Sequence, residues 1–159
     1  MATPSKVVSL EEAARRAADL RVRGGKLALA NGVFDLLHVG HVRYLEAARA
    51  LADLLVVAVN SDASVKQNRG PGLPLVPEAE RAEVVAALAA VDLVVVFAEK
   101  EVSEIIRALR PDLHVKGTDY REATVPERAL VESLGGRVVI AGDPKDHSSS
   151  ALRARLAAK

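Results

Sequence analysis

Residues 31–41 read Asn-Gly-Val-Phe-Asp-Leu-Leu-His-Val-Gly-His, and this stretch decides the fold of the chain. The apolar run 26–30 comes directly before it and predicts a buried strand. The segment 42–52 comes directly after it and has apolar residues at helical spacing, which predicts an amphipathic helix. The stretch is therefore expected to be the turn from a strand into a helix.

Such a turn is a suitable place for a phosphate group. The first residues of a helix offer free backbone N–H groups and a partial positive charge. His38 and His41 add two imidazole donors, and Gly40 between them permits close approach because it has no Cβ. The alternative is an ordinary strand-to-helix junction that carries two solvated histidines, and the strand-turn-helix context favours the phosphate site.

The rest of the chain repeats the alternation of strand and helix. Further short apolar runs predict strands at 54–59, 93–97, 113–116 and 137–141. Helices are predicted after Ser9 and at 42–52, 78–90, 102–109, 124 or 126 to 134, and 148–158. This order predicts an α/β fold with right-handed crossovers, namely a Rossmann-like, doubly wound, five-stranded parallel sheet. We expect a single domain over 1–159, with a leading helix in 1–25 and the sheet in 26–159.

The composition excludes several classes of protein. The charge is nearly balanced, with 22 basic and 21 acidic residues and no basic stripe, so nucleic acid is not an expected partner. The chain has no cysteine, which excludes disulfides and thiolate metal sites. No apolar run reaches the roughly 18 residues of a membrane span, and the first residues lack a signal-peptide pattern, so we expect a cytoplasmic protein that does not bind membranes.

Ligands of a doubly wound sheet bind beyond the carboxyl ends of its strands, and several candidate groups lie there. They are Asp35, Lys66, Arg81, the segment 116–120 (Lys-Gly-Thr-Asp-Tyr) and the segment 147–150 (His-Ser-Ser-Ser). Each has an alternative interpretation: Asp35 as a turn former, Lys66 as a solvated helix residue, and Arg81 in a surface pair with Glu80. The segment 116–120 could be an ordinary loop at the end of a strand, and the serines could be a helix cap. The Gly- and Pro-rich segment 69–77 predicts a loop, which we expect to be a mobile lid over the site.

The string 31–41 is similar to the HxGH-type nucleotidyltransferases of the cytidylyltransferase-like superfamily. Together with the segment 116–120 it most resembles the adenylyltransferase domain of ADP-heptose synthase, and glycerol-3-phosphate cytidylyltransferase is a close relative. The resemblance runs from about Val7 to Leu156. It departs from the family pattern at Thr118, which replaces a glycine, at His147, and at Leu73, where relatives usually have arginine.

The resemblance implies roles for the candidate residues. Catalytic roles fall to His38, His41 and Lys66, and acceptor binding falls to Asp35, Lys66 and Arg81. Nucleotide binding falls to Gly32, Val33, Phe34, His38, Gly40, His41, Lys116, Gly117, Asp119, Ser148, Ser149 and Ser150. No protein-held metal is implied, and Mg²⁺ would bind through the nucleotide phosphates. His147 is not counted as catalytic.

The implied reaction is attack by a phosphate oxygen of a sugar phosphate on the α-phosphorus of ATP, with release of pyrophosphate. Heptose 1-phosphate would be the acceptor and ADP-heptose the product. The alternative is a cytidylyltransferase that uses CTP and glycerol 3-phosphate or a related polyol phosphate. ATP is favoured because Asp143 stands where the cytidylyltransferases carry an arginine. A regulatory module that binds nucleotide without turnover is a third possibility, and the family also implies a possible homodimer.

Overall fold

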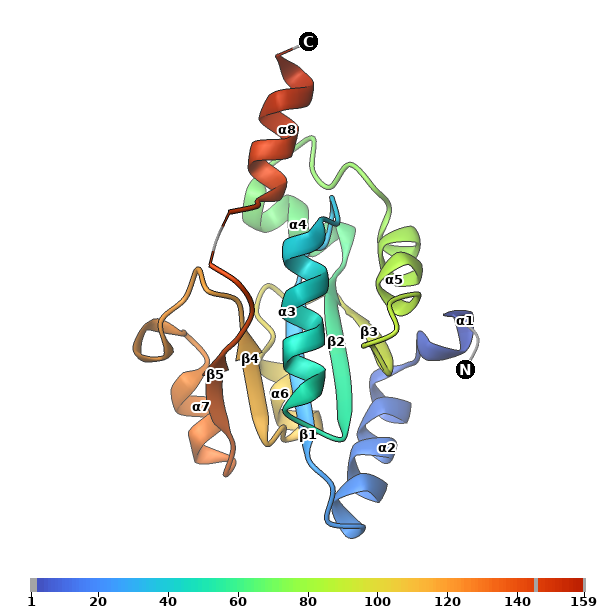
Figure 1. Cartoon of the computed structure of the whole chain (residues 1–159). Helices are drawn as coiled ribbons and strands as arrows, with labels where there is room; N and C mark the ends of the chain where they lie inside the picture. Colours follow the sequence, from blue (N-terminus) through green and yellow to red (C-terminus); the bar gives the residue numbers. More distant parts are fainter. Residues whose placement is uncertain (1–2, 145, 159) are drawn as a thin grey trace.

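A five-stranded parallel sheet lies at the centre of the computed structural model, which describes residues 3–144 and 146–158 (Figure 1). The strands are β1 (Leu27–Gly32), β2 (Leu54–Asn60), β3 (Leu93–Phe97), β4 (Leu113–Lys116) and β5 (Arg137–Ile140). Their order across the sheet is β3-β2-β1-β4-β5, and all neighbouring strands run parallel. The predicted Rossmann-like sheet is therefore confirmed.

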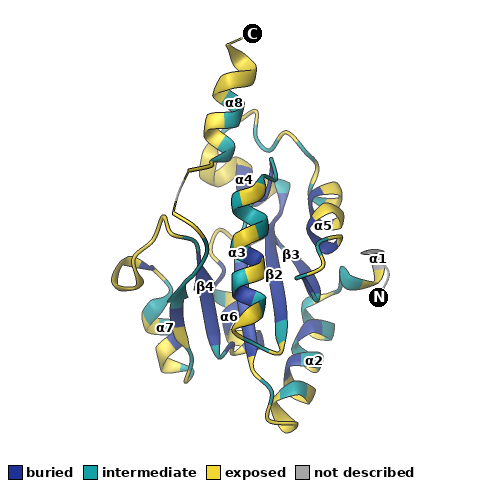
Figure 2. Cartoon of the chain, in the orientation of Figure 1, coloured by how far each residue is buried: buried dark blue, intermediate teal, exposed yellow. Residues whose placement is uncertain are grey.

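Helices cover both faces of this sheet. They are α1 (Thr3–Lys6), α2 (Leu10–Val22), α3 (Val39–Ala50), α4 (Asp62–Arg69), α5 (Glu78–Ala86), α6 (Ser103–Leu109), the 3-10 helix η1 (Glu122–Thr124), α7 (Arg128–Ser133) and α8 (Ser149–Ala157). The core is split between the two faces, because successive strand residues point to opposite sides. Ala28 and Ala30 of β1 pack in one cluster with Leu45 of α3, while Leu27 and Leu29 pack in the other with α2 and α6. Figure 2 shows the strands as the buried layer between exposed helix surfaces.

The helical segments differ from the sequence prediction in several places, and the short helix α1 was not predicted. α4 was not predicted as a helix, although Ser61 caps it by accepting a hydrogen bond from the N–H of Ser64. The predicted helix 78–90 ends at Ala86, and Lys6 binds the carbonyls of Leu88 and Val91 beyond its end. The helix predicted from 124 or 126 to 134 is shorter, because α7 runs from Arg128 to Ser133 and the separate 3-10 turn η1 ends before Pro126, next to which a helix is disfavoured.

The order of the strands places a switch point at the carboxyl end of β1. The chain crosses from β1 to β2 on one side of the sheet, whereas β4 lies on the other side of β1. Crossovers that leave in opposite directions open a crevice between them, which is where such sheets bind ligands. α8 stands out from the sheet layers beyond this edge, with none of its described residues buried (Figures 1 and 2). Among the described residues, no helix has the length and apolar character needed to cross a membrane.

Candidate active site

The turn after β1 builds a reciprocal histidine cap at the start of α3. His38 is the N-cap residue, and its Nδ1 accepts a hydrogen bond from the backbone N–H of Gly40 at 3.2 Å. His41 lies in the first turn, and its Nδ1 accepts from the backbone N–H of His38 at 3.3 Å. Since both Nδ1 atoms accept, each neutral ring carries its proton on Nε2. The two rings lie 4.0 Å apart between centroids and each has one N–H donor left for a ligand.

Burial keeps these two imidazoles neutral. Desolvation lowers the pKa of His41 to about 4, with a further lowering by His38 and an opposing effect of Asp119. Desolvation also lowers the pKa of His38, and His147 adds to this effect. Both rings are therefore uncharged at neutral pH. They can bind an anion through their N–H hydrogen bonds but not through a full positive charge.

Gly40 is required by the cap itself. A Cβ built at this position would lie 2.9 Å from the Cε1 and Nδ1 atoms of the His38 ring. Any side chain at position 40 would therefore displace the ring that caps α3. This contact gives Gly40 a second reason, besides the close approach of a ligand, to lack a side chain.

The end of β4 contributes a buried cation. The ammonium of Lys116 donates to Oδ1 of Asn31 at 3.1 Å and lies 3.7 Å from a carboxylate oxygen of Glu127. Burial lowers its pKa, and Glu127 opposes this lowering. Thr118, which replaces the glycine of the family pattern, donates to the carbonyl of Asp143 at 2.7 Å. The segment that follows β4 is thus fastened to the segment that follows β5.

The three serines at the start of α8 have different partners. Ser148 caps the helix by accepting from the N–H of Ala151 at 3.0 Å. The hydroxyl of Ser149 donates to the carbonyl of Leu36 at 2.8 Å, which joins α8 to the histidine turn. Ser150 accepts from the guanidinium of Arg153 at 3.2 Å. A single cap accounts for only one of these hydroxyls.

These groups surround a cavity of about 720 Å³ at the carboxyl edge of the sheet. Its lining includes every residue for which the sequence predicts nucleotide binding, and also Asp35. The structure therefore brings together the ends of β1 and β4 and the starts of α3 and α8. Among the described residues no group of three or more His, Cys, Asp or Glu side chains is placed to hold a metal ion.

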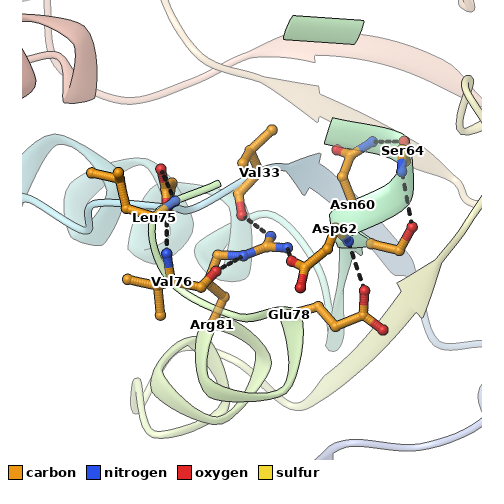
Figure 3. A network of polar contacts seen from close by, with 10 residues as sticks. Val33, Asn60, Asp62, Ser64, Leu75, Val76, Glu78 and Arg81 are labelled. Atoms are coloured by element: carbon orange, nitrogen blue, oxygen red, sulfur yellow. Dashed lines mark hydrogen bonds and ion pairs between the residues drawn. The ribbon is translucent and has the colours of Figure 1, made fainter. Parts of the chain in front are cut away.

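Arg81 is not brought to this cavity, although the sequence predicts that it contacts the acceptor. Its side chain has 0% exposure and so lies in the interior, and Figure 3 shows its guanidinium between Val33, Val76 and Asp62. The guanidinium donates to the carbonyls of Val76 and Val33 and pairs with Asp62 at 2.8 Å. Every nitrogen of the group is committed to the protein, so Arg81 holds the histidine turn, α4 and the start of α5 together.

Lys66 is also not brought to the cavity. It lies exposed on α4, whereas Val65, Asn68 and Arg69 of the same helix line the cavity. The side of α4 that faces the cavity therefore carries Arg69 and not Lys66. Because the bounds of α4 were not predicted, the side of the helix that faces the cavity could not be assigned from the sequence.

Asp35 lines the cavity but its carboxylate is largely occupied. It accepts hydrogen bonds from the backbone N–H groups of Leu75 and Val76, each at 2.9 Å at the closest oxygen. The loop 69–77 is therefore fastened to the histidine turn at its second half. The lid motion expected of this loop stays a prediction, and opening beyond Leu75 would have to break these two hydrogen bonds.

Arg153 is a cavity residue that the sequence analysis missed. Its side chain is 20% exposed, and its Nη1 lies 3.5 Å from Oδ2 of Asp35. That Nη1 is buried and has no hydrogen-bond partner. The available signal is helical spacing, because residues 149, 150 and 153 share a face of α8.

Comparison with known proteins agrees with this site. A model of the cytidylyltransferase-like family matches residues 29–155. The chain is 52% identical over 132 residues to the bifunctional protein HldE of Syntrophotalea carbinolica, which covers 82% of this chain and 27% of that protein. It is 49% identical over 151 residues to the bifunctional protein HldE of Acidiphilium cryptum, which covers 95% of this chain and 31% of that protein. The chain thus spans less than a third of the length of these curated relatives.

A solved structure has the same fold. The crystal structure of the lipopolysaccharide core biosynthesis protein from Thermoplasma volcanium superposes with a TM-score of 0.66 at 28% sequence identity. The match covers 77% of this chain and 100% of the other. The family model, which matches most of the sheet and the whole histidine turn, and the identity to the HldE proteins confirm the resemblance drawn from the sequence: the chain belongs to the cytidylyltransferase-like family.

Proposed function

We propose that the protein is an adenylyltransferase that transfers AMP from ATP to heptose 1-phosphate, releases pyrophosphate and forms ADP-heptose. The observation that carries this proposal is the reciprocal cap of His38 and His41, which leaves two neutral Nε2–H donors beside the cavity. The similarity to the HldE proteins and the match to the ADP-heptose synthase pattern support the choice of this reaction within the family.

The chain supplies positions and donors for a direct displacement. An oxygen of the acceptor phosphate forms a bond to the α-phosphorus, while the bond from that phosphorus to the oxygen bridging the α- and β-phosphates breaks and pyrophosphate leaves with its electron pair. The phosphate is already ionised at neutral pH, so no side chain has to remove a proton. His38 and His41 hold the triphosphate and stabilise the added charge, as preorganised donors do in a partly buried site. The start of α8, with Ser148 to Ser150, provides a second group of donors.

The acceptor side of the cavity lies between α4 and α8. Asp35, Arg69 and Arg153 all line the cavity, Arg69 from α4 and Arg153 from α8. We propose that they bind the phosphorylated sugar and that Arg81 acts by positioning the histidine turn and not by touching substrate. Lys66 then contributes through the positive charge of α4, from outside the cavity lining.

A divalent cation, Mg²⁺, is proposed to enter with the nucleotide. Mg²⁺ keeps most of its waters and is commonly bound through substrate phosphates, so the nucleotide would supply its ligands. When bound, it would neutralise part of the charge of the triphosphate.

The preference for ATP over CTP rests partly on Asp143. Its carboxylate pairs with Arg43 of α3 at 2.6 Å, and both residues line the cavity. The pair removes much of the repulsion that a lone carboxylate would exert on a triphosphate. The pair also engages the guanidinium of Arg43. Arg43 therefore does not supply a free guanidinium in place of the arginine that the cytidylyltransferases carry at the position of Asp143.

Pyrophosphate release tests the proposal directly. The assay combines ATP or CTP with heptose 1-phosphate or glycerol 3-phosphate, each pair in the presence of Mg²⁺. The proposal predicts that ATP with heptose 1-phosphate gives the highest kcat/KM. A clear preference for CTP with glycerol 3-phosphate would establish the cytidylyltransferase alternative, and tight nucleotide binding without turnover for any pair would establish a regulatory module.

A further inference from the structure

We infer that Asn31 is a nucleotide-binding residue whose amide is oriented by two buried neighbours, His114 and Lys116. The inference rests on the proposed function, because it concerns the nucleotide side of the same cavity. None of the candidate roles drawn from the sequence includes Asn31 or His114.

The three side chains meet where β1 and β4 lie side by side. Asn31 is near the end of β1, and His114 and Lys116 are alternate residues of β4, so both point to the same face of the sheet. His114 has 0% exposure and Lys116 has 6%, so both are removed from solvent. Asn31 is less buried and lines the cavity.

The contacts fix which way the amide of Asn31 points. An ammonium group can only donate, so the Asn31 atom 3.1 Å from the Nζ of Lys116 must be its carbonyl oxygen. The Nε2 of His114 lies 3.0 Å from the same oxygen, so that nitrogen must carry the proton. Two donors therefore hold the oxygen of Asn31 toward the interior.

This arrangement leaves the amide NH₂ of Asn31 as the polar group that it presents to the cavity. The carbonyl oxygen is saturated by its two donors, whereas no hydrogen bond of the NH₂ group is found among the described residues. The group lies at the switch point, where a nucleotide crosses the carboxyl ends of the strands. It is therefore placed to donate to an oxygen of the bound nucleotide.

The charge state of His114 agrees with this role. Desolvation, together with the neighbouring Lys116, lowers its pKa to about 3, so the ring is neutral at physiological pH. Its Nδ1 is buried without a hydrogen-bond partner. A buried polar atom without a hydrogen-bond partner lowers the stability of the fold. The imidazole of His114 is therefore not explained by its own hydrogen bonding alone. Leucine of similar size would avoid that cost but could not orient Asn31.

Kinetics with ATP as the varied substrate test the inference. Asn31→Ala should lower kcat/KM for ATP roughly ten- to hundredfold, the range for one hydrogen bond to a charged group. His114→Leu should lower it roughly three- to tenfold, and His114→Gln, which can still donate from a similar position, should stay close to wild type. The decisive variant is Asn31→Ala/His114→Leu, which should be no worse than Asn31→Ala alone, because His114 acts through Asn31.

Asn60 provides a matched control for the double variant. It ends the neighbouring strand β2 and also lines the cavity, but its NH₂ group donates to Ser64 at 2.9 Å. The effects of Asn60→Ala and His114→Leu on kcat/KM should therefore simply multiply. If the effect of His114→Leu persisted in full in the Asn31→Ala background, or if folded Asn31→Ala matched wild type, the inference would be overturned.

The tautomer of His114 gives a readout that needs no activity. Long-range ¹H–¹⁵N correlation spectra of the unmutated protein at neutral pH should show a neutral ring protonated on Nε2. A ring protonated on Nδ1, or an imidazolium, would contradict the inference even if the variants failed to fold. If the unmutated protein showed no turnover with any substrate pair, the proposed function would be wrong. That result differs from the tautomer and double-variant results that would overturn the role of Asn31, so the two failures are distinguishable.

Discussion

The ring of His41 accepts a hydrogen bond from the backbone N–H of His38, so the second histidine of the turn is part of the helix cap that the first one begins. One imidazole therefore has two separable tasks. Its Nδ1 stabilises the start of α3, and its Nε2–H remains available to a ligand. Substitutions that mimic one nitrogen at a time can separate these tasks.

We expect His41→Asn to retain the cap, because an amide oxygen can take the place of Nδ1, and to lose the donor. Turnover should fall roughly 10²–10³-fold, as it does when one preorganised oxyanion donor is removed. His41→Gln should instead keep part of the rate and lose about 1 kcal/mol of stability with the cap. Steady-state kinetics and urea unfolding of the two variants check this. Wild-type turnover in folded His41→Asn would remove His41 from the mechanism.

The buried histidines predict that acid destabilises the fold. The pKa of His114 is lowered to about 3 and that of His41 to about 4 in the folded protein, both by desolvation first. The unfolded chain, with ordinary histidine pKa values near 6.5, therefore takes up protons first as the pH falls. Stability from these groups is complete above about pH 6.5 and is lost progressively below it. Urea midpoints measured from pH 7 to pH 5 should fall less steeply in His114→Gln than in wild type, and equal slopes would contradict the prediction.

Arg81 is expected to be a positioning residue. Arg81→Lys cannot reach the carbonyls of Val33 and Val76 and the carboxylate of Asp62 together, so it should lower the free energy of unfolding by about 2–3 kcal/mol. It should also lower kcat, because the histidine turn loses its support. The neighbouring exposed residue offers a control, and Glu80→Ala should change stability by no more than about 0.5 kcal/mol. A large rise of KM for the sugar phosphate at unchanged stability would show instead that Arg81 touches the acceptor.

Arg153 is expected to bind the acceptor phosphate. Arg153→Ala should raise KM for the sugar phosphate roughly tenfold, the effect of losing a hydrogen bond to a charged group, and should leave KM for ATP nearly unchanged. Arg155→Ala is the matched control, since Arg155 is an exposed arginine of the same helix that does not line the cavity. Substrate-saturation curves for both substrates decide the matter. An effect on KM for ATP alone would move Arg153 to the triphosphate.

The strands and the histidine turn could be predicted because their signals are local. Short β-branched runs give the buried strands, and the spacing of His38, Gly40 and His41 gives the start of α3. The serine caps Ser9 and Ser148 likewise mark their helices in the sequence. Each of these features depends on residues only a few positions apart, so its pattern is visible in the sequence.

The partners of Asp35 and Arg81 could not be predicted in the same way. Asp35 meets Leu75 across the loop that follows α4, and Arg81 meets Val33 through the interior. Both contacts depend on how a loop returns to the sheet, and the expectation that these side chains contact the acceptor came from the family resemblance. The sequence prediction placed Lys66 in the site, whereas Arg69 lines the cavity, and the reason is similar. Since α4 was not predicted as a helix, the residues on its cavity-facing side could not be identified.

Direct transfer of the nucleotidyl group to a sugar phosphate can be tested with a label-transfer experiment. The protein is incubated with heptose 1-phosphate, Mg²⁺ and ATP labelled at either the α- or the γ-phosphorus. We expect the α-label to appear in the sugar product and the γ-label to appear in pyrophosphate, with no label left on the protein. Appearance of the γ-label in the sugar product, or of the α-label on the protein as an intermediate, would contradict it.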